Sequence, residues 1–153
     1  RRLPAVRWLI AGARPASALR RLGSLSGVEV HADVADLAEY LARATVALAP
    51  MDQGSGVAMK VLEAWAMGVP VVADPWTAEG LESVPAPGVA VAASPDQWVT
   101  TLLQLLNDAS AAEELGRRGR AVWERWYSPA RVCTAIAEAA RAAVTSRRPR
   151  TTG

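Results

Sequence analysis

The chain lacks the side chains from which metal centres and disulfide frameworks are built. Among its 153 residues are one cysteine, Cys133, and one histidine, His31. A single thiol cannot form an internal disulfide and is typical of a reducing compartment, so we expect a cytoplasmic location. One thiol and one imidazole are too few for an ordinary zinc site, and no metal is expected. We expect Cys133 to be a small core residue of a helix and His31 to be a structural histidine at a strand end.

Long apolar runs and a strong charge imbalance are absent as well. No apolar stretch approaches the ~20 residues of a membrane-spanning helix. The formal net charge is only +2, and no basic stripe with interleaved aromatic residues is visible, so we expect no nucleic-acid partner. Residues 147–153, RRPRTTG, are interpreted as a disordered, arginine-rich tail. Binding of this tail to an anionic membrane surface is the alternative.

The chain is long enough to form one compact domain with a core. Its first residue is arginine rather than methionine, and an apolar strand is expected from residue 6. We therefore interpret the sequence as part of a longer protein. Residues 1–146 are expected to form one domain that is truncated at its N-terminal side.

Short apolar strands alternate with amphipathic helices along the sequence. Strands are expected at residues 6–12, 28–31, 45–50, 69–74 and 88–93. Helices are expected at residues 16–25, 36–44 (capped by Asp33 or Asp36), 57–67, 94–108, 109–126 and 129–146. The alternation indicates βαβ units and an α/β fold. We expect a Rossmann-like, three-layer α/β/α domain with a parallel sheet of about five strands and a helical C-terminal extension.

Ligands of such sheets bind at the carboxyl ends of the strands. One loop expected there contains Gly54, Ser55 and Gly56, directly before a helix that starts at Val57. Glycines let a backbone approach a ligand closely, and the free amides at the positive end of a helix suit a diphosphate. The spacing matches neither GxxxxGK[ST] nor GxGxxG, because Met59 stands where a third glycine would be. An ordinary surface loop is the alternative.

Two charged residues lie one helical turn apart after this loop: Lys60, the only lysine of the chain, and Glu63. Because their helix is apolar on most sides, we expect Glu63 to be half-buried, where a carboxylate needs a partner. The two hydroxyls of a ribose would satisfy Glu63, and Lys60 could reach a phosphate as a point charge. The residues alone leave open an exposed ion pair between the two.

The sequence VALAPMDQGSGVAMKVLEAWAMGVPVVAD (46–74), followed by EGL (79–81), resembles the donor-binding signature of family 4 glycosyltransferases of the GT-B fold. The shared features are a strand ending in proline, a glycine-rich loop, K-x-L-E-A-x-A-x-G-x-P-V-V and a G-L turn. VRWLIAG (6–12) and GVEVHADVADLAEYLARA (27–44) resemble neighbouring segments of the same family. The resemblance covers about residues 3–107 and implies the C-terminal, donor-binding half of a GT-B enzyme.

The resemblance also implies roles for single residues. Glu63 matches the glutamate that holds the ribose hydroxyls, and Gly56 and Val57 match the helix start whose amides take the diphosphate. The backbone at Asp33 and Val34 matches the segment that contacts the base.

Two further positions are implied by the same comparison. Gly12 matches a glycine at the donor site. Ser55 stands where the family usually has another glutamate, which holds hydroxyls of the donor sugar. Serine can donate a hydrogen bond there but supplies no negative charge.

The implied activity is transfer of a sugar from a UDP-, GDP- or dTDP-sugar to an acceptor, with retention and without a metal or cofactor, as in polysaccharide biosynthesis. An N-terminal half of the same polypeptide would bind the acceptor, and peripheral membrane association of that full-length protein is implied. No catalytic residue is assigned here, and the isolated chain is expected to be inactive. A non-catalytic nucleotide-binding or interaction domain, and a sugar-nucleotide epimerase of the same fold, are the alternatives.

Overall fold

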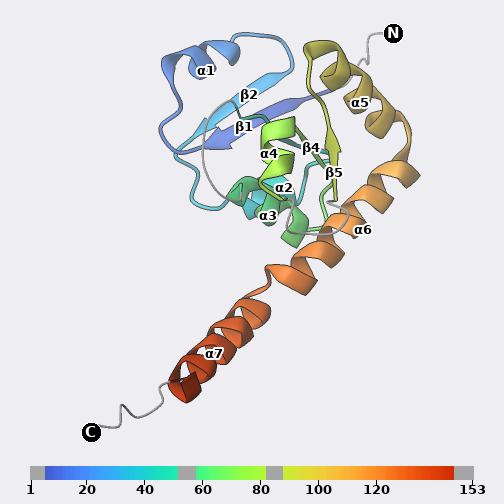
Figure 1. The fold of residues 1–153 in the computed structure, drawn as a ribbon. Coiled ribbons are helices and arrows are strands. Elements are labelled where there is room, and N and C mark those ends of the chain that lie inside the picture. The colour runs from blue at the N-terminus through green and yellow to red at the C-terminus, as the bar shows by residue number, and fades with distance from the viewer. Residues whose placement is uncertain (1–5, 52–57, 82–87, 147–153) are drawn as a thin grey trace, which may run out of the picture. The chain divides into compact units, whose positions relative to one another are not determined.

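A computed structural model describes residues 6–51, 58–81 and 88–146 of the chain (Figure 1). The chain forms two compact units, an N-terminal unit of residues 1–44 and a C-terminal unit of residues 45–153. None of the helices described is long and apolar enough to cross a membrane.

The N-terminal unit is a βαβ unit followed by one short helix. Strands β1 (Trp8–Gly12) and β2 (Val28–Ala32) pair in parallel, with Gly12 opposite Ala32 at their carboxyl ends. Helix α1 (Ser17–Leu22) connects them, and α2 (Ala38–Leu41) follows β2. In residues 6–44 no side chain is fully buried. A two-stranded parallel sheet with so little core of its own is only marginally stable.

The C-terminal unit contains a parallel sheet of three strands in the order β3-β4-β5. The strands are β3 (Ala47–Ala49), β4 (Val71–Ala73) and β5 (Val89–Val91). The helices are α3 (Met59–Ala66), α4 (Pro75–Glu79), α5 (Pro95–Asn107), α6 (Ala109–Trp126) and α7 (Pro129–Ser146). All three residues of the central strand β4 are fully buried, as expected for a strand covered on both faces.

The core of this unit is built around Trp65 of α3, which is completely buried. Its indole Nε1–H donates to the carbonyl of Gly88 at 3.0 Å. Helix α6 approaches α3 closely because it presents glycines at the contact: a Cβ at Gly119 would lie 2.3 Å from Trp65 Cδ1, and one at Gly116 would lie 2.1 Å from the Gly68 carbonyl oxygen. Only glycine permits this spacing.

The α/β fold and the alternation of parallel strands and helices are confirmed. One expectation was wrong: the five strands form not one sheet but two, with two strands in the N-terminal unit and three in the C-terminal unit. Whether residues 1–146 act as a single domain stays a prediction. The arginine-rich tail at 147–153 lies outside the described residues.

One local expectation also needs correction. Cys133 is exposed rather than part of the core, because every α7 side chain whose burial is described is exposed except the partly covered Ala137. Of the two aspartates expected at the start of α2, Asp36 makes the contact, since its Oδ1 accepts from the Ala38 amide at 2.8 Å, whereas Asp33 accepts from the Arg14 amide. Residues 75–79 form the short helix α4, which Asp74 caps and which has Pro75 in its first turn.

Candidate functional site

The carboxyl ends of β3 and β4 are held together by the side chains of Asp74 and Thr77. The Asp74 carboxylate accepts from the amide of Thr77 at 2.8 Å and, through its other oxygen, from the amide of Met51. The Thr77 hydroxyl, on a residue that is only 3% exposed, lies 3.0 Å from Asp74 Oδ2 and 3.3 Å from the Ala49 carbonyl oxygen. These side-chain contacts join the segments that follow β3 and β4, beyond Ala49 and Ala73, the last paired residues of the two strands.

The carboxylate of Asp74 is stabilised in its ionised form. Burial by itself would raise the pKa of Asp74, but the hydrogen bonds from the Thr77 amide, the Met51 amide and the Thr77 hydroxyl together lower this pKa below its ordinary value. At neutral pH the group therefore acts only as a hydrogen-bond acceptor.

Helix α3 carries Lys60 and Glu63 on its exposed side, while Val61, Ala64 and Trp65 are buried on the other. Glu63 is thus exposed rather than half-buried, and burial does not oblige it to have a partner. Within the part of the chain that the structure describes, neither Lys60 nor Glu63 forms an ion pair, with each other or with another residue. The exposed ion pair considered from the sequence does not form there.

Among the described residues, no side chain caps the start of α3. Its N-cap residue is Ala58, whose methyl group accepts no hydrogen bond, and the first turn holds no acidic side chain. The first amides of a helix have no acceptor within the helix itself. Among the described residues, the Val61 amide donates to the Ala58 carbonyl oxygen at 2.9 Å, and no acceptor is described for the amides of Met59 and Lys60. An anion could accept from these two amides at the positive end of the helix dipole.

The N-terminal unit has a similar arrangement at the carboxyl ends of its two strands. Asp33 Oδ1 accepts from the Arg14 amide at 2.9 Å, and the Asp33 amide donates to the Gly12 carbonyl oxygen at 2.7 Å. Asp33 and Arg14 both have positive φ angles, of 53° and 45°, a backbone conformation that costs energy in residues other than glycine. A Cβ at Gly12 would meet nothing within 4 Å, so there is open space at the end of β1. Val34, the next residue, is partly buried.

The predicted site residues therefore fall into three sets. The structure brings Gly12 and Asp33 together at one strand end, with Val34 following, and places Lys60 and Glu63 on one side of α3. The glycine-loop residues lie outside the described residues: Gly54, Ser55, Gly56 and Val57.

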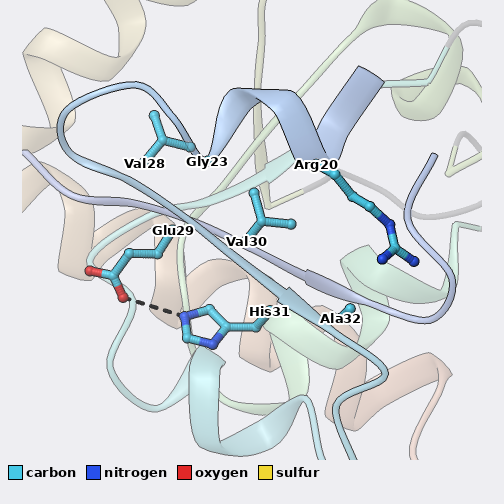
Figure 2. A pocket seen from close by; sticks show the side chains of 7 residues that line it. All are labelled: Arg20, Gly23, Val28, Glu29, Val30, His31 and Ala32. Atoms are coloured by element: carbon cyan, nitrogen blue, oxygen red, sulfur yellow. Dashed lines mark hydrogen bonds and ion pairs between the residues drawn. The ribbon is translucent and has the colours of Figure 1, made fainter. Parts of the chain in front are cut away.

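A hollow of about 540 Å³ lies along β2 and α1 and contains none of the predicted site residues (Figure 2). Figure 2 shows Glu29 and His31 pointing toward one another from β2, with His31 Nε2 3.3 Å from Glu29 Oε2. The Arg7 guanidinium also bonds to Glu29, at 2.8 Å through Nε. Hydrogen bonds from Arg7 and then His31 lower the pKa of Glu29. His31, whose ring centroid is 5.1 Å from that of Tyr40, is thus a partnered structural histidine, as predicted.

Sequence reasoning missed Asp74, Thr77 and the amide of Met51. The signal was present: an aspartate directly after a strand, followed by proline and, two residues later, by threonine, is typical of a capped helix start. Among residues 6–51, 58–81 and 88–146, no three histidine, cysteine or acidic side chains are grouped so that they could hold a metal ion.

A family model described as glycosyl transferases group 1 matches residues 1–108 of the chain. The chain belongs to this family. The matched part of this glycosyl transferases group 1 domain begins before β1, ends just after α5 and includes all nine predicted donor-binding residues, whereas α6 and α7 follow it. No curated protein matches the chain significantly. The family resemblance is confirmed, and the roles of the single residues stay predictions.

Proposed function

We propose that this glycosyl transferases group 1 domain binds the nucleoside-diphosphate part of a sugar donor at the carboxyl ends of its strands. The observation that carries the proposal is the start of α3, where an uncapped helix end is followed by an exposed lysine and an exposed glutamate. Neither has a charged partner among the described residues. A cation and free amides suit a diphosphate, and a carboxylate suits the two hydroxyls of a ribose.

Each predicted residue then has a chemical task. Lys60 and the amides at Gly56 and Val57 bind the diphosphate, to which Gly54 allows a close approach. Glu63 accepts from the ribose hydroxyls, and Ser55 donates to a hydroxyl of the sugar.

The base would be bound in the N-terminal unit. The open space at Gly12 admits a ligand, and the backbone at Asp33 and Val34 offers its hydrogen-bonding groups. The Asp33 carboxylate is already used by the Arg14 amide, so the base contact is assigned to the backbone rather than to this side chain.

The contribution of this domain to catalysis would be electrostatic. When the bond between the anomeric carbon and the diphosphate breaks, negative charge grows on the leaving oxygen. Fixed amides and an ammonium group stabilise that charge more than they stabilise the bound donor. The acceptor oxygen then bonds to the same carbon on the face that the diphosphate leaves and gives its proton to the departing diphosphate oxygen, which yields retention. We assign acceptor binding to the other half of the GT-B enzyme. The complete enzyme would act in the cytoplasm, at the surface of a membrane.

A second candidate function is donor binding without transfer. It is favoured by Ser55, because serine leaves the sugar site without the negative charge that the family usually places there. The two functions differ in turnover of the complete protein and not in nucleotide binding by this domain.

Ligand-observed NMR of this chain with UDP, GDP, dTDP, ADP and NAD tests the proposal. We expect one nucleoside diphosphate to bind with a Kd near 1 mM, roughly −4 kcal/mol, and we expect its binding to be at least about tenfold weaker in Glu63→Ala. Glu113→Ala is the matched control, since it removes an exposed glutamate from α6 and is expected to change nothing. Equal binding by Glu63→Ala and the parent would contradict the role of Glu63, and no binding of any of the five would contradict the proposal for this chain.

A further inference from the structure

We propose that Asp74 is a positioning residue, which fixes the direction of the backbone at Met51, where the chain leaves β3. The inference rests on the proposed function for the effect on nucleotide binding, but its geometry stands independently. Asp74 follows the last residue of β4, and Met51 lies two residues beyond the end of β3. A bond to the Met51 amide therefore acts just after the carboxyl end of β3.

The Asp74 carboxylate is itself held in place. Its Oδ1 is bound by the Thr77 amide at 2.8 Å, and its Oδ2 lies 3.0 Å from the Thr77 hydroxyl. Because Thr77 is almost fully buried and lies in the first turn of α4, the carboxylate cannot turn away without losing both contacts. Oδ2 therefore faces the Met51 amide in a fixed orientation.

Capping α4 does not require the contact with Met51. An N-cap side chain needs only one acceptor for an amide in the first turn, and the Thr77 amide supplies that contact. Asp108, which caps α6 by accepting from the Ala111 amide at 2.9 Å, shows this simpler use. The second oxygen of Asp74, which already accepts from the Thr77 hydroxyl, also accepts from the Met51 amide after the neighbouring strand.

The N-terminal unit repeats the arrangement independently. There Asp33, just after β2, accepts from the Arg14 amide in the loop that follows β1. In each unit an aspartate at the carboxyl end of one strand thus binds an amide in the loop after the neighbouring strand. One of the two loops carries the predicted base contact and the other carries the predicted diphosphate contact.

Asp74→Ser separates the two roles of this residue. Serine is a good N-cap, so the contact to the Thr77 amide can persist, whereas the shorter side chain does not reach Met51. Asp108→Ser is the matched control, because it makes the same exchange at a helix start that has no neighbouring loop amide. The ¹⁵N-labelled chain gives three readouts: exchange of the Met51 amide hydrogen, the amide signals of residues 52–57, and the Kd of the nucleoside diphosphate that the parent binds.

For Asp74→Ser we expect at least about tenfold faster exchange of the Met51 amide, displaced signals for residues 52–57 and a Kd raised about tenfold, roughly 1.4 kcal/mol. Asp108→Ser is expected to change none of the three. Unchanged Met51 exchange or unchanged loop signals in Asp74→Ser would overturn the inference. An unchanged Kd beside altered loop signals would also overturn it, and would leave the proposed function intact.

Two other results, a parent that binds no nucleotide and a variant that does not fold, also have a clear interpretation. If the parent binds no nucleotide, the proposed function fails, and the Met51 and loop signals still decide whether Asp74 positions the chain. If Asp74→Ser does not fold, the parent is titrated with acid. The Met51 amide signal is then expected to move as Asp74 is protonated, because this amide donates to Asp74 Oδ2. A Met51 signal that stays constant through that titration would overturn the inference.

Discussion

Trp65 and Gly119 touch so closely that a Cβ on Gly119 would lie 2.3 Å from Trp65 Cδ1. The indole cannot move away easily, since it is completely buried and its Nε1–H donates to Gly88. Alanine would improve the helix propensity of α6 by about 1 kcal/mol. Overpacking a dense core costs typically 1–3 kcal/mol, and loss of the Trp65 hydrogen bond adds to that cost.

We therefore expect Gly119→Ala to lower the free energy of unfolding by about 1–3 kcal/mol, measured by urea denaturation. Gly12→Ala is the control, because a Cβ there meets nothing within 4 Å. A Gly119→Ala chain as stable as the parent would contradict the packing described for α3 and α6.

The stabilising effect of Asp74 is expected to depend on pH. The pKa of Asp74 is lower in the folded chain than its ordinary value. Its contribution to stability is therefore fully present above the unfolded pKa of about 3.9 and is lost as the pH falls through the folded pKa. The difference in free energy of unfolding between the parent and Asp74→Ser is expected to be largest near pH 7 and to shrink below about pH 4. Urea denaturation at several pH values checks this, and a difference that grows toward acid pH would be inconsistent with it.

Lys60 is expected to act on the diphosphate through its charge. Lys60→Gln is predicted to raise the Kd of the nucleoside diphosphate about tenfold, on the order of 1.4 kcal/mol, and the effect is predicted to decline with added salt. Arg141→Gln is the control, because it removes one positive charge from an exposed position on α7. It shows whether the Kd responds to the charge at position 60 or only to the net charge of the chain. Equal losses in both variants would show that only net charge matters.

Cys133 is expected to react with a thiol reagent in the folded chain. It is exposed on α7 and is the only cysteine, so the signal has one source. Labelling of Cys133 without denaturant is predicted to go to completion, at a rate within about tenfold of the rate in denaturant. The reason is that the reagent reacts with thiolates that it can reach from solvent. Complete protection in the absence of denaturant would contradict the exposure of α7 in this chain.

The order of strands and helices could be predicted because the two elements have different apolar periods. The division of the strands into two sheets could not be predicted, because the alternation of strands and helices along the chain does not show which strands pair. The burial of Glu63 was misjudged for a related reason. Its helix is rich in apolar residues, but Met59 and Met67 are 63% and 40% exposed, and composition does not tell which apolar residues face solvent.

The residues at the strand ends show the same limit of prediction from sequence. A glycine at position 12 and an aspartate at position 33 could be recognised by resemblance to a family. The bond from Asp74 to Met51 joins residues that are 23 positions apart, and it depends on the pairing of β3 with β4. Local sequence predicted neither that pairing nor the bond.

The central claim is that Glu63 holds the hydroxyls of a ribose, and a thermodynamic cycle tests it most directly. The Kd of the bound nucleoside diphosphate is measured against that of its 2′,3′-dideoxy analogue, for the parent and for Glu63→Ala. If Glu63 accepts from these hydroxyls, the parent is predicted to bind the analogue at least about tenfold more weakly, roughly 1.4 kcal/mol, whereas Glu63→Ala is predicted to bind both ligands equally weakly. A parent that binds the two ligands equally well, or a Glu63→Ala variant that still prefers the ribose, would contradict the account.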